Sequence, residues 1–165
     1  MIEQFRGEHF FLSNMKPLKY TILTNQNTYA LTSEHAYQAA KFTDTATHQQ
    51  VAHMTVQKRA LEEEYDGIAA KNFAHELIEA GEPLRVGWGN PMKLAVMEEV
   101  VRRKFIANPD LLDMLIATGD ELLVEGNDWG DHFWGVDPIG SDNGENHLGL
   151  ILMHVREKLR KQLVA

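Results

Sequence analysis

The sequence predicts an α+β protein that is mainly helical, with one small antiparallel sheet near its N-terminus. Segments with helical periodicity fill most of the chain after residue 33, whereas residues 20–32 combine β-branched and aromatic residues around turn-forming ones. A length of 165 residues with 44% hydrophobic residues suits one folded domain with one core. We therefore expect a single domain over residues 1–165.

The first elements are predicted from short apolar runs. Phe10–Asn14 turns from apolar to polar, which predicts a short strand that runs into a loop. Tyr20–Leu23 and Thr28–Thr32 follow as the two strands of a hairpin, with Asn25–Asn27 as the turn. These segments account for the whole of the expected sheet.

Helices are expected to follow the hairpin. Ser33 is a suitable N-cap for a helix through Phe42. Asn90 and Pro91 predict a cap followed by proline at the first helical position of a central buried helix. That helix carries Leu94, Met97, Val101 and Phe105 at helical spacing, and further helices are predicted at 45–54, 56–65, 68–80, 109–116 and 148–163.

The region between the last two helices differs in composition. Glu121–Glu125 is predicted as a strand, and residues 126–149 are rich in glycine and aspartate. A long segment without regular structure inside a compact domain usually has a function, so we expect a functional loop here.

Charge and composition limit the classes of function. Asp and Glu number 24 against 16 Lys and Arg, so the formal net charge of −8 repels phosphate backbones, and an anionic ligand needs a local basic pocket. Cysteine is absent, which excludes disulfides and thiolate chemistry. The sequence shows neither a membrane-length apolar run nor a leader, so we expect a cytoplasmic protein, in a bacterial cell or in a host if phage-encoded, with no membrane partner.

One helical face combines residues that can act on a ligand. Glu34, Gln38 and Lys41 lie at i, i+4 and i+7, within about 40° of one direction over roughly 10 Å, with Tyr37 beside them. An exposed stripe of ordinary helical charge spacing is the alternative. In the first helical turn the macrodipole and free N–H groups favour an ionised Glu34, which suits a base or a stabiliser of positive charge.

The glycine-rich segment offers a second group of candidates. Trp129 and Trp134 flank Asp131, and Trp88 also adjoins glycine. Tryptophan faces stack on flat heterocycles, although tryptophan is more often part of a core. Asp131 is a candidate second carboxylate of a glycosidic site, with a structural Asx turn as the alternative.

A metal centre is not expected. The chain has eight histidines but neither an HExxH motif nor a closely spaced His/Asp ligand set, and residues 137–145 do not reproduce a calcium loop. We therefore expect no metal and no cofactor.

Several segments, read in order, match one known family over nearly the whole chain. They are Phe11-Leu12-Ser13-Asn14, residues 33–42, Pro83-Leu84-Arg85 with Trp88, Lys104-Phe105, Leu123-Val124-Glu125, residues 131–135, Asn146-His147-Leu148-Gly149 and Arg156. In this order and spacing the sequence resembles the NADAR family of YbiA-like N-glycosidases. It departs from some relatives near Asn72-Phe73-Ala74, where a Gly-Arg pair is missing.

The resemblance implies hydrolysis of an N-glycosidic bond between ribose C1′ and an exocyclic amine. The substrate is either a small phosphorylated ribosylamino-pyrimidine of riboflavin biosynthesis or ADP-ribosylated guanine in nucleic acid, where the reaction is de-ADP-ribosylation. The net charge favours the small metabolite, although Lys16 and Lys19 offset it. The resemblance implies catalytic roles for Glu34, Lys41 and Asp131, and substrate contacts for Ser13, Asn14, Trp88 and Trp134. We also expect Tyr37 and Gln38, on the helical face, and Gly135 to bind substrate.

Two points stay open from the sequence. Lys41 either binds phosphate as a cation or, with a lowered pKa, attacks C1′ to form a Schiff base. The alternatives to an enzyme are a non-catalytic module that binds ADP-ribose or a nucleotide, and an interaction protein that docks through its tryptophan loop. The sequence does not set the oligomeric state.

Overall fold

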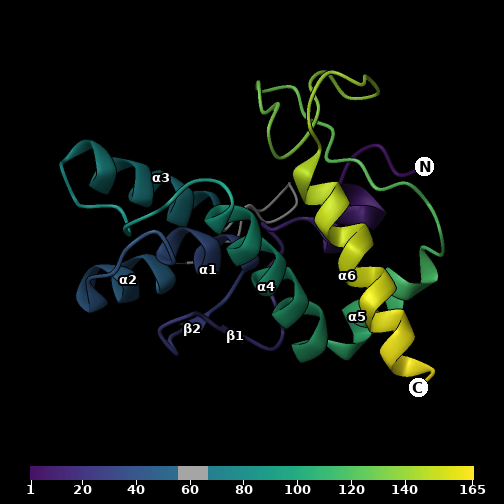
Figure 1. The fold of residues 1–165 in the computed structure, drawn as a ribbon, viewed down its shortest axis with the longest axis horizontal. Coiled ribbons are helices and arrows are strands. Elements are labelled where there is room, and N and C mark those ends of the chain that lie inside the picture. The colour runs from purple at the N-terminus through teal and green to yellow at the C-terminus, as the bar shows by residue number, and fades with distance from the viewer. Residues whose placement is uncertain (56–66) are drawn as a thin grey trace. The chain divides into compact units, whose positions relative to one another are not determined.

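The computed structural model describes residues 1–55 and 67–165, and its contacts divide the chain into two compact units (Figure 1). One unit combines Met1–Ser13 with Pro109–Ala165, and the other is Asn14–Asn108. The helix predicted over residues 56–65 lies outside the described residues. A single domain over 1–165 stays a prediction.

The α+β class is confirmed, because the described chain is mainly helical with one two-stranded antiparallel sheet. The elements in chain order are η1 (Gly7–Leu12), β1 (Ile22–Leu23), β2 (Tyr29–Ala30), α1 (Ser33–Ala39), α2 (Thr45–Ala52), α3 (Gly67–Glu79), α4 (Met92–Ala107), α5 (Pro109–Ala117) and α6 (His147–Leu163). Among the described residues, no helix is long and apolar enough to cross a membrane.

The hairpin and the first helix follow each other directly in the second unit. Ile22 pairs with Ala30 and Leu23 with Tyr29, so the predicted hairpin is confirmed with shorter strands. The predicted cap of α1 is wrong by one residue. Thr32, in extended backbone, is the N-cap, because its side chain accepts the N–H of His35 at 3.1 Å.

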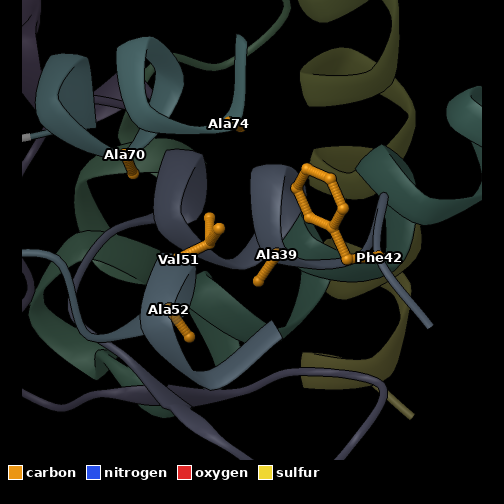
Figure 2. Packing of buried hydrophobic residues seen from close by; sticks show 6 residues of the cluster. All are labelled: Ala39, Phe42, Val51, Ala52, Ala70 and Ala74. Atoms are coloured by element: carbon orange, nitrogen blue, oxygen red, sulfur yellow. The ribbon is translucent and has the colours of Figure 1, made fainter. Parts of the chain in front are cut away.

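Small residues let the helices of this unit pack closely. The buried cluster in Figure 2 joins α1, the turn after it, α2 and α3, and it consists of Ala39, Phe42, Val51, Ala52, Ala70 and Ala74. Alanine has almost no side chain to separate two helix backbones, so α3 lies directly against α1. This packing positions the residues of the candidate site.

A buried histidine joins α2 to the hairpin. The Nε2 atom of His48 lies 2.6 Å from the hydroxyl of Thr24, and both side chains are buried. Burial lowers the pKa of His48, because a charged ring would lose its hydration. The neutral ring therefore acts as a structural link between these two elements.

The central helix, α4, has the expected buried face but a different start. Met97, Val101 and Phe105 are buried as predicted, while Leu94 is half-buried. Pro91 precedes the helix, which begins at Met92, so its predicted place at the first helical position is wrong. Residues 90 and 91 are joined by a cis peptide bond. The sequence pattern of a cap followed by proline does not show whether this bond is cis or trans.

Two strand predictions in the other unit are wrong. The segment predicted as a strand at Phe10–Asn14 forms the 3-10 helix η1 up to Leu12, because its three apolar residues all turn into the core. Glu121–Glu125 forms only an isolated parallel bridge between Ile2 and Leu123. Ile2 donates to Leu122 and accepts from Val124, whereas the Glu125 N–H and the Leu123 carbonyl oxygen pair with the side chain of Asn146 instead of with a strand.

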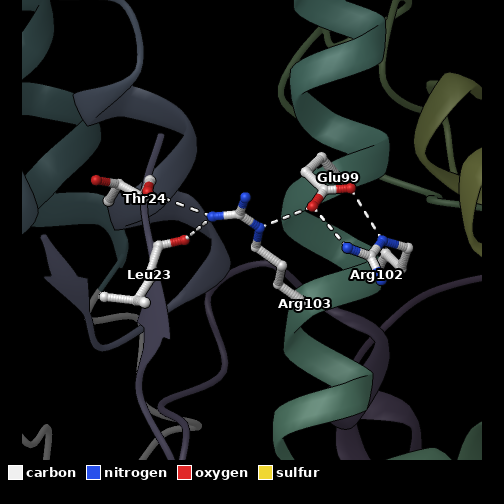
Figure 3. Close-up of polar contacts among 5 residues, drawn as sticks. All are labelled: Leu23, Thr24, Glu99, Arg102 and Arg103. Atoms are coloured by element: carbon white, nitrogen blue, oxygen red, sulfur yellow. Dashed lines mark hydrogen bonds and ion pairs between the residues drawn. The ribbon is translucent and has the colours of Figure 1, made fainter. Parts of the chain in front are cut away.

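The helix α4 is joined to the hairpin through an arginine, as Figure 3 shows. Arg103 donates to the carbonyl oxygens of Leu23 at 2.7 Å and Thr24 at 3.3 Å, and also to Glu99 at 2.8 Å. Hydrogen bonds from Arg102, together with those from Arg103, lower the pKa of Glu99 to about 2. Glu99 thus holds Arg103 in place to pair with the hairpin backbone.

We predict that Arg103→Gln lowers the free energy of unfolding by about 1–2 kcal/mol, because two backbone carbonyls lose a charged donor. Urea denaturation followed by circular dichroism measures this change. Arg102→Gln is the matched control, because Arg102 contacts Glu99 but not the hairpin, and it should cost about 0.5 kcal/mol or less. Equal losses in both variants would contradict a special role for Arg103.

Candidate active site

Glu34 sits in the first turn of α1 and is held by its own backbone. Its N–H donates to the carbonyl oxygen of Asn14 at 3.0 Å, and its side chain is only 7% exposed. Because Asn14 and Thr32 accept the N–H groups of Glu34 and His35, these two donors are not free for an anion, contrary to the sequence-based expectation. The first turn of α1 is thus fixed by these hydrogen bonds, and the two N–H groups are already paired within the protein.

The side chain of Glu34 is held from two sides. The Nε2 atom of Gln38, one turn along, donates to Oε1 of Glu34 at 2.6 Å in a buried setting. On the other side α3 begins at Gly67, where a Cβ atom would lie 2.7 Å from Cβ of Glu34 and 2.6 Å from Sδ of Met15. Only glycine lets α3 begin at this distance from Glu34.

Lys41 lies beyond the helix rather than on it. α1 ends at Ala39, and the N–H of Lys41 bonds to the carbonyl oxygen of Gln38 at 3.2 Å in the tighter turn that closes the helix. The i+7 position predicted for Lys41 on the helix is therefore wrong, because the helix is shorter than its sequence pattern. The ammonium still points to the same region, 5.5 Å from the ring centre of Tyr37.

The protein around Lys41 favours the neutral form of its amine more strongly than bulk water would. Burial lowers the pKa of Lys41, and the positive charges of Lys71 and Lys93 act in the same direction. The negative charge of Glu34 opposes this effect but is the smaller influence. Of the two influences weighed from the sequence, desolvation therefore exceeds the attraction of Glu34.

A tryptophan from the segment between α3 and α4 completes this group. Arg85 donates its N–H to the carbonyl oxygen of Lys41 at 2.6 Å, and Trp88 donates to Arg85 at 3.0 Å. The Trp88 ring lies 5.5 Å from that of Tyr37 at an angle of 53°. The second unit thus brings together six of the predicted residues, namely Asn14, Glu34, Tyr37, Gln38, Lys41 and Trp88.

His35 is a residue of this region that sequence reasoning missed. Its ring is fully buried, with Nδ1 at 2.7 Å from the Thr32 hydroxyl and Nε2 at 3.1 Å from the carbonyl oxygen of Met54. Burial lowers its pKa, opposed by the hydrogen bond to Met54, so the neutral ring is favoured. A threonine three residues before the histidine, at a helix start, was the one available signal. Gly67 lies between the helices predicted at 56–65 and 68–80, and no sequence signal indicated its contact with Glu34.

Asp131 lies in the first unit and organises its own loop. Oδ1 accepts the N–H groups of Phe133 at 3.1 Å and Trp134 at 2.9 Å, which is the Asx turn weighed as the structural alternative. The side chain of Asn127 binds both backbone groups of Asp131. Because Asp131 and Glu34 belong to different units, their pairing as two catalytic carboxylates stays a prediction.

The remaining predicted residues also belong to the first unit. Trp134 is half-buried and meets Phe133 edge-on at 4.9 Å. A side chain on Gly135 would overlap the carbonyl oxygen of Glu125, so this glycine is required by close packing. Ser13 is buried just after η1 and donates its N–H to Phe10 at 2.9 Å. Their contact with substrate stays a prediction.

No group of three or more histidine, aspartate or glutamate side chains is placed to hold a metal ion within residues 1–55 and 67–165. The residues gathered around Glu34 include amides, an amine and aromatic rings. Such a set suits acid–base or nucleophilic chemistry on an organic substrate.

We predict that Asp131→Ala loosens the turn over residues 131–134, because two N–H groups lose their acceptor, whereas Asp131→Asn keeps an acceptor oxygen in place. Hydrogen exchange of the Trp134 amide measures this, and the alanine variant should exchange at least 10-fold faster. If Asp131 also transfers a proton, Asp131→Asn will lose kcat while exchange stays normal. Full activity of the asparagine variant would contradict a catalytic role.

Comparison with known proteins identifies the class to which this arrangement belongs. An N-glycosidase of Nostoc punctiforme is 36% identical over 138 residues, which cover 84% of this chain and 80% of that protein. N-glycosidase YbiA of Escherichia coli is 32% identical over 128 residues, 78% of this chain and 69% of that protein. The NMR structure of Escherichia coli YbiA superposes with a TM-score of 0.74 and 26% identity, and covers 99% of this chain and 89% of that one.

A longer relative has a different name. A riboflavin biosynthesis protein of Vibrio vulnificus is 36% identical over 153 residues, which are 93% of this chain but only 36% of that protein. The present chain therefore corresponds to about one third of it.

These relatives define the class as enzymes of the N-glycosidase type. The family model of the NADAR domain matches residues 3–160, so the chain belongs to the NADAR family, and it is an N-glycosidase. The resemblance stated from the sequence is confirmed.

Proposed function

We propose that this enzyme hydrolyses the bond between ribose C1′ and the exocyclic amine of small phosphorylated ribosylamino-pyrimidines. The observation that carries the proposal is the buried carboxylate of Glu34, held by Gln38 in the unit that also contains Lys41 and Trp88. A carboxylate in such a place can stabilise positive charge at C1′ or activate water.

Glu34 is suited to the direct reaction. Cleavage of an N-ribosyl bond passes through an oxocarbenium-like state with positive charge on C1′ and the ring oxygen. The amide of Gln38 donates to Oε1 of Glu34 and so holds this carboxylate in place. The bond from C1′ to the exocyclic nitrogen breaks as the leaving amine gains a proton, for which Asp131 is the proposed source. Water then adds to C1′, and the proton that it loses restores the acid.

Lys41 offers a covalent route. A ribosylamine opens to an imine at C1′, and the neutral Lys41 amine adds there through its lone pair. The bond from C1′ to the exocyclic nitrogen then breaks as that nitrogen gains a proton. Water hydrolyses the resulting lysine imine and restores the amine. The lowered pKa of Lys41 supports this route over a purely cationic role.

Aromatic side chains are proposed to hold the base. Trp88 is half-buried and packs at an angle on Tyr37, so its exposed part offers a stacking face next to Lys41. Trp134 is proposed as the second aromatic contact, with Ser13, Asn14 and Gly135 at the border of the bound substrate. Stacking of this kind contributes about 1–3 kcal/mol per base.

Two observations favour the small metabolite over ADP-ribosylated guanine in nucleic acid. The net charge of −8 repels a polyanion before it reaches the site. A relative at 36% identity is named as a riboflavin biosynthesis protein. De-ADP-ribosylation of guanine is the alternative substrate reaction.

We expect faster hydrolysis of a ribosylamino-pyrimidine phosphate than of an ADP-ribosylated guanine oligonucleotide when chromatography follows both side by side. Glu34→Gln should keep the circular dichroism spectrum and lose at least 100-fold in kcat, because the variant lacks the carboxylate charge that stabilises positive charge at C1′. A faster reaction on the oligonucleotide would reverse the substrate assignment, and near-normal turnover by Glu34→Gln would remove this residue from the mechanism.

Borohydride trapping separates the two roles of Lys41. In the covalent route, sodium borohydride added during turnover reduces the lysine imine, and peptide mass spectrometry should find a ribosyl adduct on Lys41. The adduct should be absent without substrate, and Lys93 is an internal control for non-specific reaction. Turnover without any adduct at Lys41 would leave only the cationic role.

A further inference from the structure

Within residues 1–55 and 67–165, two buried acceptor atoms on residues that contact Glu34 have no hydrogen-bond partner. They are Oε1 of Gln38 and Oδ1 of Asn14, whose residues are 2% and 8% exposed. No donor in the described part of the chain reaches either atom. A buried carbonyl oxygen without a donor costs free energy, so such an atom next to a carboxylate indicates a missing partner.

The orientation of the Gln38 amide follows from its neighbour. Its Nε2 atom lies 2.6 Å from a carboxylate oxygen of Glu34, a distance that requires the NH₂ group there. Turning the amide over would bring two acceptor oxygens together. The Oε1 atom therefore points away from Glu34 and can only accept a hydrogen bond.

Asn14 also contacts Glu34. Its backbone carbonyl accepts the N–H of Glu34, while its Nδ2 atom lies 3.3 Å from Sδ of Met97, a weak acceptor. Both unpartnered oxygens are thus attached to residues that contact Glu34 directly. A substrate bound at Glu34 therefore lies near the two residues that carry these atoms.

The chemistry at C1′ selects the donor that they would meet. The groups next to C1′ that carry donor hydrogens are the exocyclic amine and the 2′-hydroxyl. The amine leaves and must gain a proton, so it needs a donor rather than an acceptor. The 2′-hydroxyl remains a donor throughout, and hydrogen bonds to this position strengthen in glycosidic transition states.

We propose that Gln38 is the residue that makes the enzyme specific for ribosyl over 2′-deoxyribosyl substrates. Its Nε2 side positions the carboxylate of Glu34, and its Oε1 side accepts the 2′-hydroxyl, with Asn14 as the second acceptor on the sugar. This inference rests on the proposed function for its sugar, and it adds a specificity that the N-glycosidase class does not include.

The test compares kcat/KM for matched ribosyl and 2′-deoxyribosyl forms of the pyrimidine substrate. We expect the wild-type enzyme to favour the ribosyl form at least 100-fold, because the analogue leaves a buried acceptor unpaired. Gln38→Met keeps the shape but neither hydrogen bond, so the preference should fall to about 5-fold or less. Gln162→Met, on the exposed end of α6, is the matched control and should keep the wild-type ratio.

A second variant separates recognition from positioning. Gln38→Glu keeps acceptor oxygens but, when ionised, has no hydrogen to donate to Glu34. We expect it to lose kcat while it keeps the preference for the ribosyl form. An unchanged preference in folded Gln38→Met, or loss of the preference in Gln38→Glu with normal kcat, would overturn the proposal.

A binding measurement keeps the inference testable if the enzyme hydrolyses neither pyrimidine form. Thermal-shift titrations with ribose 5-phosphate and 2-deoxyribose 5-phosphate should show stronger stabilisation by the ribose compound in the wild type. The difference should disappear in Gln38→Met. This result without hydrolysis would reject the proposed function and retain the sugar specificity, whereas equal or absent binding of both sugars would reject the specificity.

Discussion

The hydrogen bond from the Glu34 N–H to the carbonyl oxygen of Asn14 is the contact on which the arrangement of the site depends. It fixes the first turn of α1 against the segment before the hairpin, while Thr32 caps the same turn from its other side. Both contacts occupy backbone N–H groups of this turn, while the side chain of Glu34 accepts a hydrogen bond from Gln38. Gly67 lets α3 begin beside Glu34, because glycine has no side chain to overlap that residue.

Local burial, rather than the charge of the whole chain, decides the electrostatics of the site. The net charge of −8 would favour protonated lysines everywhere, yet burial lowers the pKa of Lys41, and two neighbouring lysines reinforce this. The same effect keeps His35 and His48 neutral, so their rings serve as hydrogen-bond links to Thr32 and Thr24. Desolvation therefore favours the neutral form of all three groups, and in the two histidines the neutral ring joins neighbouring elements.

The predictions that succeeded rest on local patterns. The hairpin, most helices and the buried face of α4 follow from residue type and periodicity over a few turns. The strands expected at Phe10–Asn14 and Glu121–Glu125 failed because short apolar runs do not reveal whether a partner strand exists. Lys41 was placed on the helix because alanine-rich sequence favours helix, whereas the turn toward Arg85 ends α1 at Ala39.

What the sequence by itself determined is the family, the mainly helical class and the spacing of the candidate residues in 33–42 and around Asp131. Those properties reside in the order of residues and in interactions within one or two helical turns. The tertiary structure decided that Trp88 packs on Tyr37, that Lys41 is desolvated and that the Gln38 oxygen meets no donor within residues 1–55 and 67–165. Each of these depends on burial by segments distant in the chain, and burial is a property of the packed fold that no local pattern contains.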